Sequence, residues 1–407
     1  MSPTRRQVYR RRRLAFFGAL AVVLASAVYL TSTGLAPVSA LDASVSEPAA
    51  LTQAAATPTW PSQGAGAIGA IGFDGVLGSS GDQSSVPIAS ITKMVTALVI
   101  LDAKPLTGDD EGPDISFTDK DVDIYYDAVA ENGSVAPVSA GMVLTQRQAL
   151  ETMLIPSANN YSVSLAVLAF GSVDAYLGAA SAYLSEHGLT ATTVADTSGI
   201  SAQSVSSPSD LVAIGKLVMA DPVLPSIVAM PSAEIPTVGT VTNTNKLLGV
   251  DGVDGIKTGT TDEAGACLLF AVDVPVGDTT VTLVGVVLGG NTHPELNTTV
   301  RTLIASVSPG FHQVTLVEEG TVYASYTTPW GQSGQAVAES SQSAVVWSDT
   351  PVSTDVEVEP LTVGTEGDTV GSVDVTIGSA VVTVPLILDT SITDPGPFWR
   401  WTHPGQV

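Results

Sequence analysis

Three short segments contain residues that could perform acyl transfer on a serine. The first places Ser90 and Lys93 three positions apart, just before an apolar run over residues 94–101. The run predicts a helix that begins at the serine, and residues three apart share one helix face. A serine hydroxyl needs an adjacent base, and a lysine can be that base when burial or a second cation, such as Lys257, lowers its pKa. The alternative is a capped helix whose lysine reaches solvent.

The second segment, Ser157-Ala158-Asn159, follows a predicted helix. Thr145 is the expected N-cap, and Pro156 ends the helix. We therefore expect Ser157 and Asn159 on a short loop that directs a hydroxyl and an amide into a cleft. A plain polar turn is the alternative. The apolar stripe of the helix consists of Ala149, Leu150, Met153 and Leu154.

The third segment, Lys257-Thr258-Gly259, precedes an apolar run over residues 265–272 that predicts a buried strand. Residues 281–288 predict the neighbouring strand. An edge strand that carries this segment could bind a peptide by strand addition, and Gly259 would let a ligand approach the backbone closely. An ordinary hairpin with an exposed lysine is the alternative.

The stretch from about Ala67 to Phe311 resembles the D-alanyl-D-alanine carboxypeptidases of peptidase family S11, the low-molecular-mass penicillin-binding proteins. The three segments in this order are typical of such enzymes. The resemblance rests on residues 87–94, 154–159, 196–201, 243–248 and 253–259. It implies an acyl-enzyme mechanism in which Ser90 is the acylated nucleophile, Lys93 is its base and Ser157 relays a proton.

The resemblance also implies how substrate is bound. Asn159 would bind the substrate amide, Lys257 and Thr258 would meet the terminal carboxylate, and the N–H groups of Ser90 and Thr260 would form the oxyanion hole. Two positions depart from the family pattern. Asn160 stands where the family often has an aspartate. Asn291 follows Gly289-Gly290 where many members have an arginine, which leaves one carboxylate-binding contact unassigned.

The function implied is that of a serine D-Ala-D-Ala carboxypeptidase, which removes the terminal D-alanine of peptidoglycan stem peptides and is acylated by penicillin and other β-lactams. A β-lactamase or D,D-endopeptidase of the same fold is the enzyme alternative, and a catalytically silent wall-binding module is the non-enzyme one. Class A β-lactamases use a glutamate for deacylation. Between Asn160 and Ile256 only Glu186 and Glu234 occur, and neither lies in a Glu-x-x-Leu-Asn segment.

Composition excludes several classes of function. The 407-residue chain has a net charge of −25, and six of its 15 basic residues are arginines within the first 13 positions. The rest is strongly acidic, so we expect no nucleic-acid partner. The single cysteine, Cys267, is expected in the core. The four histidines show no metal-ligand spacing, and we expect neither metal nor cofactor.

The N-terminal 40 residues combine these arginines with an apolar run over residues 14–30. As a helix the run would span about 25 Å, which is marginal for a bilayer, and the arginines would hold the N-terminus in the cytoplasm. Val38-Ser39-Ala40 could be a signal-peptidase site. We expect a retained anchor, with a cleaved signal peptide as the alternative. In either case the protein is expected to be extracytoplasmic, attached to the membrane or secreted to the cell wall.

Residues 41–60, rich in Ala, Ser, Thr and Pro, predict a flexible linker. Residues 61–310 predict a mixed α/β (α+β) domain of the transpeptidase type, an antiparallel sheet sandwiched by helices. The acidic residues 104–140 are expected to be less regular and to lie at the surface, and residues 160–220 are expected to be helical. From residue 311 to 407 apolar residues alternate with polar ones, which predicts a small β-sandwich. The aromatic tail at residues 398–401 is expected to dock on it.

Overall fold

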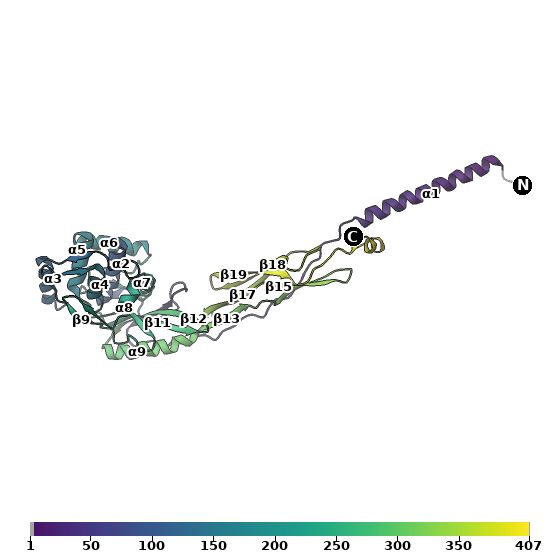
Figure 1. The fold of residues 1–407 in the computed structure, drawn as a ribbon. Helices are drawn as coiled ribbons and strands as arrows, with labels where there is room; N and C mark the ends of the chain where they lie inside the picture. Colours follow the sequence, from purple (N-terminus) through teal and green to yellow (C-terminus); the bar gives the residue numbers. More distant parts are fainter. Residues whose placement is uncertain (1–3, 407) are drawn as a thin grey trace. The chain divides into compact units, whose positions relative to one another are not determined.

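The computed structural model describes residues 4–406, which form two compact units. The central unit comprises Ala55–His312. The terminal unit comprises the chain up to Ala54 together with the chain from Gln313 onwards. In Figure 1 the helices and sheet of the central unit run from blue to green, and the later strands of the terminal unit are yellow-green. The two termini therefore belong to the same unit, and the central unit is inserted between its parts.

The central unit is built on a five-stranded antiparallel sheet in the order β10-β11-β12-β2-β3. The long hairpin and the edge position of the strand with Lys257 were both predicted, and both are confirmed. Edge strand β10 pairs only with β11, so that Lys257 lies opposite Leu269 and Gly259 opposite Cys267. The strands are β2 (Ala65–Ala70), β3 (Gly78–Ser80), β10 (Val253–Thr261), β11 (Gly265–Val276) and β12 (Thr279–Gly290).

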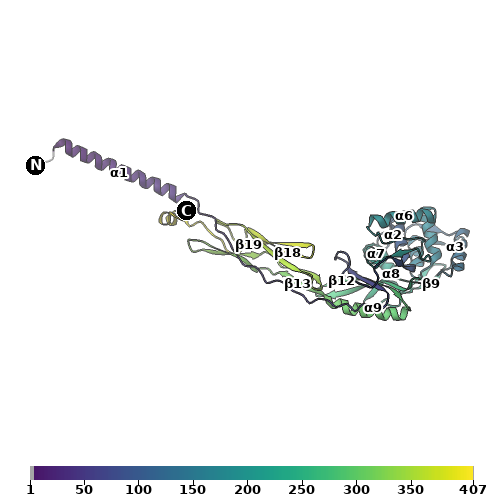
Figure 2. The ribbon, with the colours of Figure 1, turned by 180° about the vertical axis from the view of Figure 1, so that it is seen from behind.

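Helices cover both faces of this sheet. Helix α7 (Pro208–Ala220) packs on β2, β11 and β12, and α9 (His293–Val307) packs on β11 and β12 from the other side (Figure 2). Helix α2 (Thr92–Ala103) lies among α5, α6 and α7, so nearly all of its side chains are buried. The expected sheet sandwiched by helices is thereby confirmed.

The remaining elements of the central unit are short helices and two-stranded ladders. They are β4 (Val86–Pro87), η1 (Ala89–Ile91), β5 (Asp114–Ser116), α3 (Asp119–Ala130), β6 (Val143–Thr145), α4 (Gln146–Leu154), α5 (Asn159–Phe170), α6 (Val173–Glu186), β7 (Val205–Ser206), α8 (Leu224–Val228), β8 (Ser232–Ile235), β9 (Gly239–Thr242) and η2 (Ser308–Gly310).

Local capping explains where several helices begin. The Thr145 side chain accepts a hydrogen bond from the Gln148 N–H and caps α4 as predicted. The stretch expected to be less regular, residues 104–140, contains β5 and also the helix α3, which was not predicted. Its N-cap Thr118 and Asp121 form a capping box, a signal that outweighed the low apolar content of the segment.

The terminal unit is an all-β domain with a helix from each end of the chain. Its main sheet has the order β1-β14-β15-β19-β18-β17, and β13 pairs with β16. The predicted period-two pattern is confirmed, since Val373, Val375, Val384 and Leu386 face one core. The strands are β1 (Ser44–Val45), β13 (Phe311–Val317), β14 (Val322–Thr327), β15 (Ser333–Ala338), β16 (Gln342–Trp347), β17 (Val352–Val358), β18 (Thr369–Ile377) and β19 (Ala380–Leu388).

The segment expected to be a flexible linker is partly ordered on this sheet. Strand β1 pairs antiparallel with β14, with Ser44 opposite Ser325. Leu41 and Leu51 make isolated bridges to Leu361 and Val352. Part of the 41–60 segment is therefore held by backbone pairing, although its composition alone predicts flexibility. The edge of β14 offers unpaired N–H and C=O groups to which β1 bonds.

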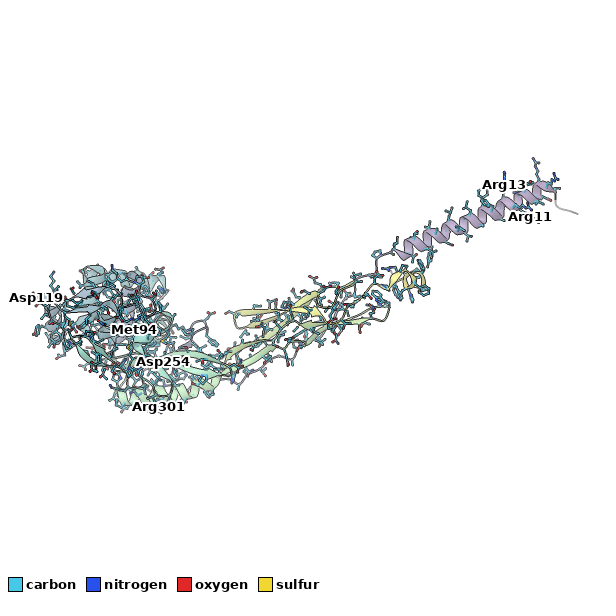
Figure 3. All side chains as sticks on the ribbon, viewed as in Figure 1. Arg11, Arg13, Met94, Asp119, Asp254 and Arg301 are labelled. Carbon is cyan, nitrogen blue, oxygen red and sulfur yellow. The ribbon has the colours of Figure 1, made fainter. Side chains whose placement is uncertain are left out.

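Two helices end the terminal unit. Helix α1 (Arg5–Gly34) contains the predicted apolar run, is long and apolar enough to cross a membrane, and has Arg11 and Arg13 near its N-terminal end (Figure 3). Helix α10 (Gly396–Thr402) packs beside its other end. Its Trp399 ring also contacts Trp330 of the β domain, with the ring centroids 5.5 Å apart, which agrees with the predicted docking of the aromatic tail. The Trp401 indole donates to the Leu30 carbonyl at 2.9 Å.

Candidate active site

Ser90 lies in a tight turn that leads into α2. It occupies the middle of the 3-10 helix η1, and α2 itself begins at Thr92, so the helix starts two residues later than predicted. The preceding Ala89 has a φ of 47°. Gly199, at φ +80°, closes this turn from outside, because a Cβ there would lie 1.8 Å from the Ala89 carbonyl oxygen. The serine is thus fixed by backbone geometry on two sides.

Lys93 is fully buried directly beneath this serine. Its Nζ donates to Ser90 Oγ at 3.1 Å, to Asn159 Oδ1 at 2.7 Å and to the Ser198 carbonyl at 3.1 Å. The three acceptors come from η1, from α5 and from the loop after residue 195. Lys93 is therefore held in place by its hydrogen bonds and does not extend to solvent as the alternative interpretation supposed.

The surroundings of Lys93 favour its neutral form. Burial is the largest cause of a pKa well below the ordinary value, the charge of Lys257 lowers the pKa further, and Asp196 opposes the shift. The three donated bonds use all the protons of the charged ammonium group. Once one proton is lost, the amine has a lone pair that can accept the Ser90 proton across the same 3.1 Å as the hydroxyl oxygen attacks a carbonyl carbon. This pair can therefore perform serine nucleophilic catalysis.

Asn159 joins Lys93 from α5, of which it is the first residue. The expectation of a loop is wrong for Asn159 and correct for Ser157, because the helix begins only three residues after Pro156. Gly133 makes room for the amide, since a Cβ on Gly133 would lie 2.5 Å from Asn159 Nδ2. The Asn159 oxygen binds lysine, and its NH2 group lies toward the 133–134 loop.

Ser157 is buried, 5% exposed, and adopts the left-handed conformation at φ 66°. Within the described chain its hydroxyl makes no hydrogen bond to Ser90 or Lys93. The structure therefore brings Ser90, Lys93 and Asn159 into one network and leaves Ser157 outside it. A non-glycine residue held at positive φ carries strain that is common at functional sites.

Asn160, which departs from the family pattern, supports the backbone of the site. Its Oδ1 accepts from the Ala136 N–H at 3.1 Å and its Nδ2 donates to the Ala136 carbonyl at 3.0 Å. An aspartate could accept from that N–H but could not donate to the carbonyl. Asn160 thus fastens the 133–137 loop to α5, next to Asn159.

Asp196 organises a loop whose role the sequence did not assign. The carboxylate accepts backbone N–H groups from Ser198 at 2.6 Å, from Gly199 and from Ser201 at 2.7 Å. These bonds turn the Ser198 carbonyl toward Lys93 and bring Gly199 against Ala89. An aspartate followed by small residues and Gly signals such a turn, but the segment's contact with Lys93 is long-range.

On the edge strand, Lys257 is 2% exposed and donates to the Thr258 carbonyl at 3.2 Å. The alternative of an exposed hairpin lysine is therefore excluded. Burial lowers the pKa of Lys257 to about 7. The Thr258 hydroxyl lies 2.6 Å from that of Thr244, in the segment that precedes the strand. Thr244 thereby ties the predicted 243–248 motif to β10.

Gly259 brings this strand against the serine. A Cβ on Gly259 would lie 2.9 Å from the Ile88 carbonyl oxygen and 3.1 Å from the Ser90 nitrogen. Any side chain would push β10 away from η1. Because Gly259 has no side chain, the backbone around Thr260 can approach the Ser90 N–H. An oxyanion hole formed by the N–H groups of Ser90 and Thr260 requires this arrangement.

His293 is a neighbour of the edge strand that the sequence did not identify. Its Nε2 lies 2.6 Å from Thr260 Oγ1, although 33 residues separate the two. The imidazole is half-buried, and its pKa is lowered by burial and then by the charge of Lys257. Among residues 4–406, no three side chains of His, Cys, Asp or Glu lie close enough together to hold a metal ion.

The sequence profile of peptidase family S11, D-alanyl-D-alanine carboxypeptidase, matches residues 72–292. The match covers more than half of the chain and contains all three motifs, and the structure has the corresponding mixed fold. The chain belongs to this family.

Curated relatives are moderately similar. The D-alanyl-D-alanine carboxypeptidase DacA of Escherichia coli is 28% identical over 253 residues, which is 61% of each chain. A D-alanyl-D-alanine endopeptidase of Pseudomonas aeruginosa is 30% identical over 209 residues, 49% of this chain and 63% of that protein. The chain thus matches about three fifths of the length of these relatives.

A solved structure extends the likeness beyond the central unit. The peptidoglycan synthesis regulatory factor PBP3 of Streptococcus pneumoniae superposes with a TM-score of 0.61 at 22% identity, covering 84% of this chain and all of the other. At this identity the likeness concerns the fold, which includes a β domain after the helical part.

Proposed function

We propose that the protein is a serine D-Ala-D-Ala carboxypeptidase acting on peptidoglycan stem peptides. The observation that carries the proposal is the buried Lys93 amine, 3.1 Å from Ser90 Oγ and with a strongly lowered pKa. Such a pair activates a serine without a histidine. Family membership supports the substrate class, and the names of the curated relatives agree with it.

In the proposed acylation, Ser90 Oγ attacks the carbonyl carbon between the two terminal D-alanines while Lys93 accepts the hydroxyl proton. The N–H groups of Ser90 and Thr260 bind the oxygen that becomes negative. The C–N bond then breaks, and the amine of the departing D-alanine takes up a proton, with Ser157 as the proposed relay. A water molecule, deprotonated by the Lys93 amine, then hydrolyses the ester and restores Ser90.

Substrate binding is proposed along β10. A peptide added to this edge would place its carbonyl near Gly259 and its terminal carboxylate near Lys257 and Thr258. Asn159 would hold the amide of the penultimate residue. The buried position of Lys257 supports this role, because a carboxylate that reaches it loses water and is stabilised by the adjacent charge. Penicillin, which also carries a carboxylate beside a reactive amide, would acylate Ser90.

The test is D-alanine release from a pentapeptide ending in D-Ala-D-Ala, together with covalent labelling by a fluorescent penicillin. The wild type should do both, and Ser90→Ala should do neither while remaining folded. Ser84→Ala, at an exposed serine in the preceding loop, is the matched control and should behave as wild type. Labelling that persists in Ser90→Ala would contradict the assignment of the nucleophile.

A D,D-endopeptidase acting on cross-linked peptides is the second candidate, favoured by the relative of that name from Pseudomonas aeruginosa. A cross-linked dimer peptide supplied beside the pentapeptide distinguishes the two. A β-lactamase receives less support, because Glu186 and Glu234 are both exposed and Glu234 bonds to Thr240. Fast hydrolysis of a chromogenic cephalosporin without D-alanine release would favour it nonetheless.

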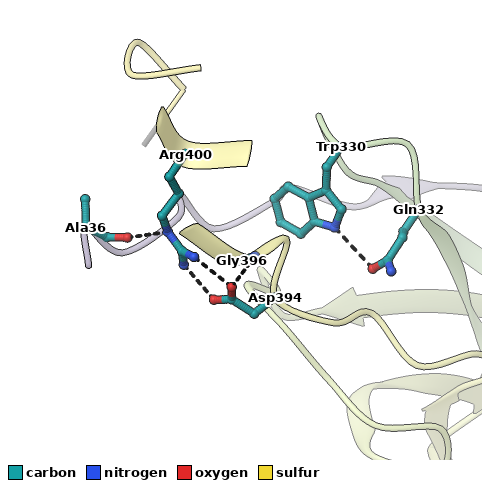
Figure 4. Close-up of polar contacts among 6 residues, drawn as sticks. All are labelled: Ala36, Trp330, Gln332, Asp394, Gly396 and Arg400. Carbon is teal, nitrogen blue, oxygen red and sulfur yellow. Dashed lines mark hydrogen bonds and ion pairs between the residues drawn. The ribbon is translucent and has the colours of Figure 1, made fainter. Parts of the chain in front are cut away.

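We also propose that α1 is retained as a membrane anchor. The Arg400 side chain donates to the Ala36 carbonyl at 2.7 Å and forms an ion pair with Asp394 at 2.6 Å (Figure 4). Tyr29 donates to the Trp401 carbonyl at 2.9 Å. Val38, within the possible cleavage site, is 7% exposed, which opposes the access that a peptidase needs. Mass spectrometry of the mature protein tests this, since an N-terminus at Leu41 would rule out the anchor.

A further inference from the structure

The first turn of α9 contacts the edge strand next to the candidate active site. His293 is the first residue of this 15-residue helix, after the N-cap Thr292. Its Nε2 lies 2.6 Å from the hydroxyl of Thr260, the residue that directly follows the Lys257-Thr258-Gly259 segment. An ionisable side chain thus lies against the residue next to the segment proposed to bind the terminal carboxylate.

We propose that His293 is a specificity residue for the free terminal carboxylate of the substrate, which it binds as an imidazolium beside Lys257, so that substrate capture takes up a proton. The inference rests on the proposed carboxypeptidase function. His293 would supply the carboxylate contact that the chain lacks at Asn291. It does so from a different position and with a side chain that titrates. An arginine would be charged at every working pH, whereas a histidine is not.

The electrostatics of the free site favour neutral groups. Burial lowers the pKa of His293, and the charge of Lys257 lowers it further. Burial lowers the pKa of Lys257 itself to about 7. The N-terminus of α9 adds a partial positive charge that disfavours a cation and favours an anion. Two basic groups are therefore held close together, and each loses its proton more readily than in water.

An arriving carboxylate reverses this balance. A negative charge near both groups raises both pKa values, because it favours their charged forms. Binding then draws protons from solvent, so affinity rises as pH falls through the interval between the free and the bound pKa values. The carboxylates on the surrounding elements are Asp262 and Glu263 after β10 and Glu295 on α9, all exposed. None of them is among the causes that shift the pKa of His293.

A purely structural role for His293 makes a different prediction. The Thr260 N–H is a proposed member of the oxyanion hole, so the hydrogen bond to its side chain could merely hold β10 in place. Loss of such support would lower kcat through poorer transition-state stabilisation and would not depend on the substrate's charge. A carboxylate-binding role instead raises KM for a free acid and leaves an uncharged analogue unaffected.

The experiment uses the full chain and two peptides, one ending in D-Ala-D-Ala and the other in D-Ala-D-alaninamide. Release of D-alanine or its amide is measured from pH 5.5 to 8.5 in wild type, in His293→Gln and in His187→Gln. Glutamine keeps a polar partner for Thr260 without ever carrying charge. His187 is an exposed histidine stacked on Tyr183 in α6 and is the matched control.

We expect His293→Gln to raise KM for the free acid about tenfold at low pH, as loss of one charge-assisted hydrogen bond would, with kcat nearly unchanged. The remaining pH dependence of KM should have a shallower slope, because only Lys257 still titrates. The amide peptide should show no difference between His293→Gln and wild type. Equal losses for acid and amide, or a fall in kcat at constant KM, would overturn the proposal.

Failure of the proposed function would be visible separately. If the wild type releases neither product, the carboxypeptidase assignment is wrong, and the two peptides are compared as competitors of fluorescent penicillin labelling. His293→Gln should then reduce the advantage of acid over amide as a competitor. An unchanged acid-to-amide ratio would refute the role of His293 independently of turnover.

Discussion

The two units of this protein have interiors of opposite character. The central unit buries two lysines, several amides and a network of hydroxyls around Ser90. The terminal unit buries a core of Val, Leu, Ala and Tyr side chains, and its buried Arg400 is neutralised by Asp394. Burial of an unpaired ionisable group costs free energy, whereas burial of an aliphatic side chain contributes to stability.

The difference indicates that the central unit is destabilised by the buried ionisable groups of its candidate active site. Neither Lys93 nor Lys257 forms an ion pair within the described chain, and the pKa values of both are lowered mainly by burial. Burial disfavours the charged form of both lysines, and a general base must be in its neutral form. The terminal unit carries no such cost, so the two units should respond differently to mutation and to pH.

The largest expected effect is on acylation by loss of the base. Lys93→Ala should slow penicillin acylation by about 10²–10⁴-fold, the usual contribution of a general base. In the wild type, acylation should rise with pH through the lowered pKa of Lys93, because only the neutral amine accepts a proton, and the variant should lack this rise. Lys104→Ala, at an exposed lysine just after α2, is the control. Similar rates in both variants would remove Lys93 from the mechanism.

The next effect is on stability as a function of pH. Between pH 7 and 10.5 an unfolded chain keeps a proton on Lys257 that the native state has lost. The free energy of unfolding of the central unit should therefore rise with pH, by up to about 1.4 kcal/mol per pH unit for this one group. Lys257→Met should flatten that rise.

Urea unfolding of the central unit at several pH values between 7.5 and 9.5 measures this slope. The exposed Lys120 gives the matched control, since Lys120→Met should leave the slope unchanged. An unaltered slope in Lys257→Met would mean that Lys257 is protonated in the native state.

A third prediction addresses the terminal unit alone. Leu386 on β19 is fully buried, so Leu386→Ala should destabilise that unit by about 2–5 kcal/mol through lost burial and a residual cavity. Val381→Ala, on the same strand but 59% exposed, should have little effect. Penicillin acylation should stay near the wild-type rate in both variants. A large loss of acylation in Leu386→Ala would show that the β domain shapes the site.

The smallest effect is expected from removing the terminal unit. A fragment of residues 55–312 contains the five-stranded sheet, its helices and every site residue. Its acylation rate should lie within about twofold of the full chain, as expected for an independent domain with its own core. A folded fragment that no longer reacts with penicillin would contradict the separation of the two units.

Local signals in the sequence were sufficient for much of the fold. Thr145 as an N-cap, the long hairpin and the alternating strands of the terminal unit follow from capping, turns and periodicity, which act over a few residues. Helix α3 was missed because its apolar content is low, although its capping box was readable.

The site was only partly accessible from sequence. Ser90 and Lys93 could be paired because three residues on a helix bring them together. The contacts of Lys93 with Asn159 and Ser198, and of His293 with Thr260, join positions 33 to 105 residues apart along the chain. No periodicity encodes such contacts, since they depend on how separate elements pack.

The buried thiol of Cys267 can be used to measure local opening of the central unit. Cys267 lies opposite Gly259 across the β10–β11 pairing, is fully buried, and burial raises the pKa of its thiol to about 11. A thiol reagent can reach it only when the core packing around it opens, because a buried protonated thiol does not react. The rate of thiol labelling therefore measures, without any engineered probe, how often the core of the central unit opens beside Gly259.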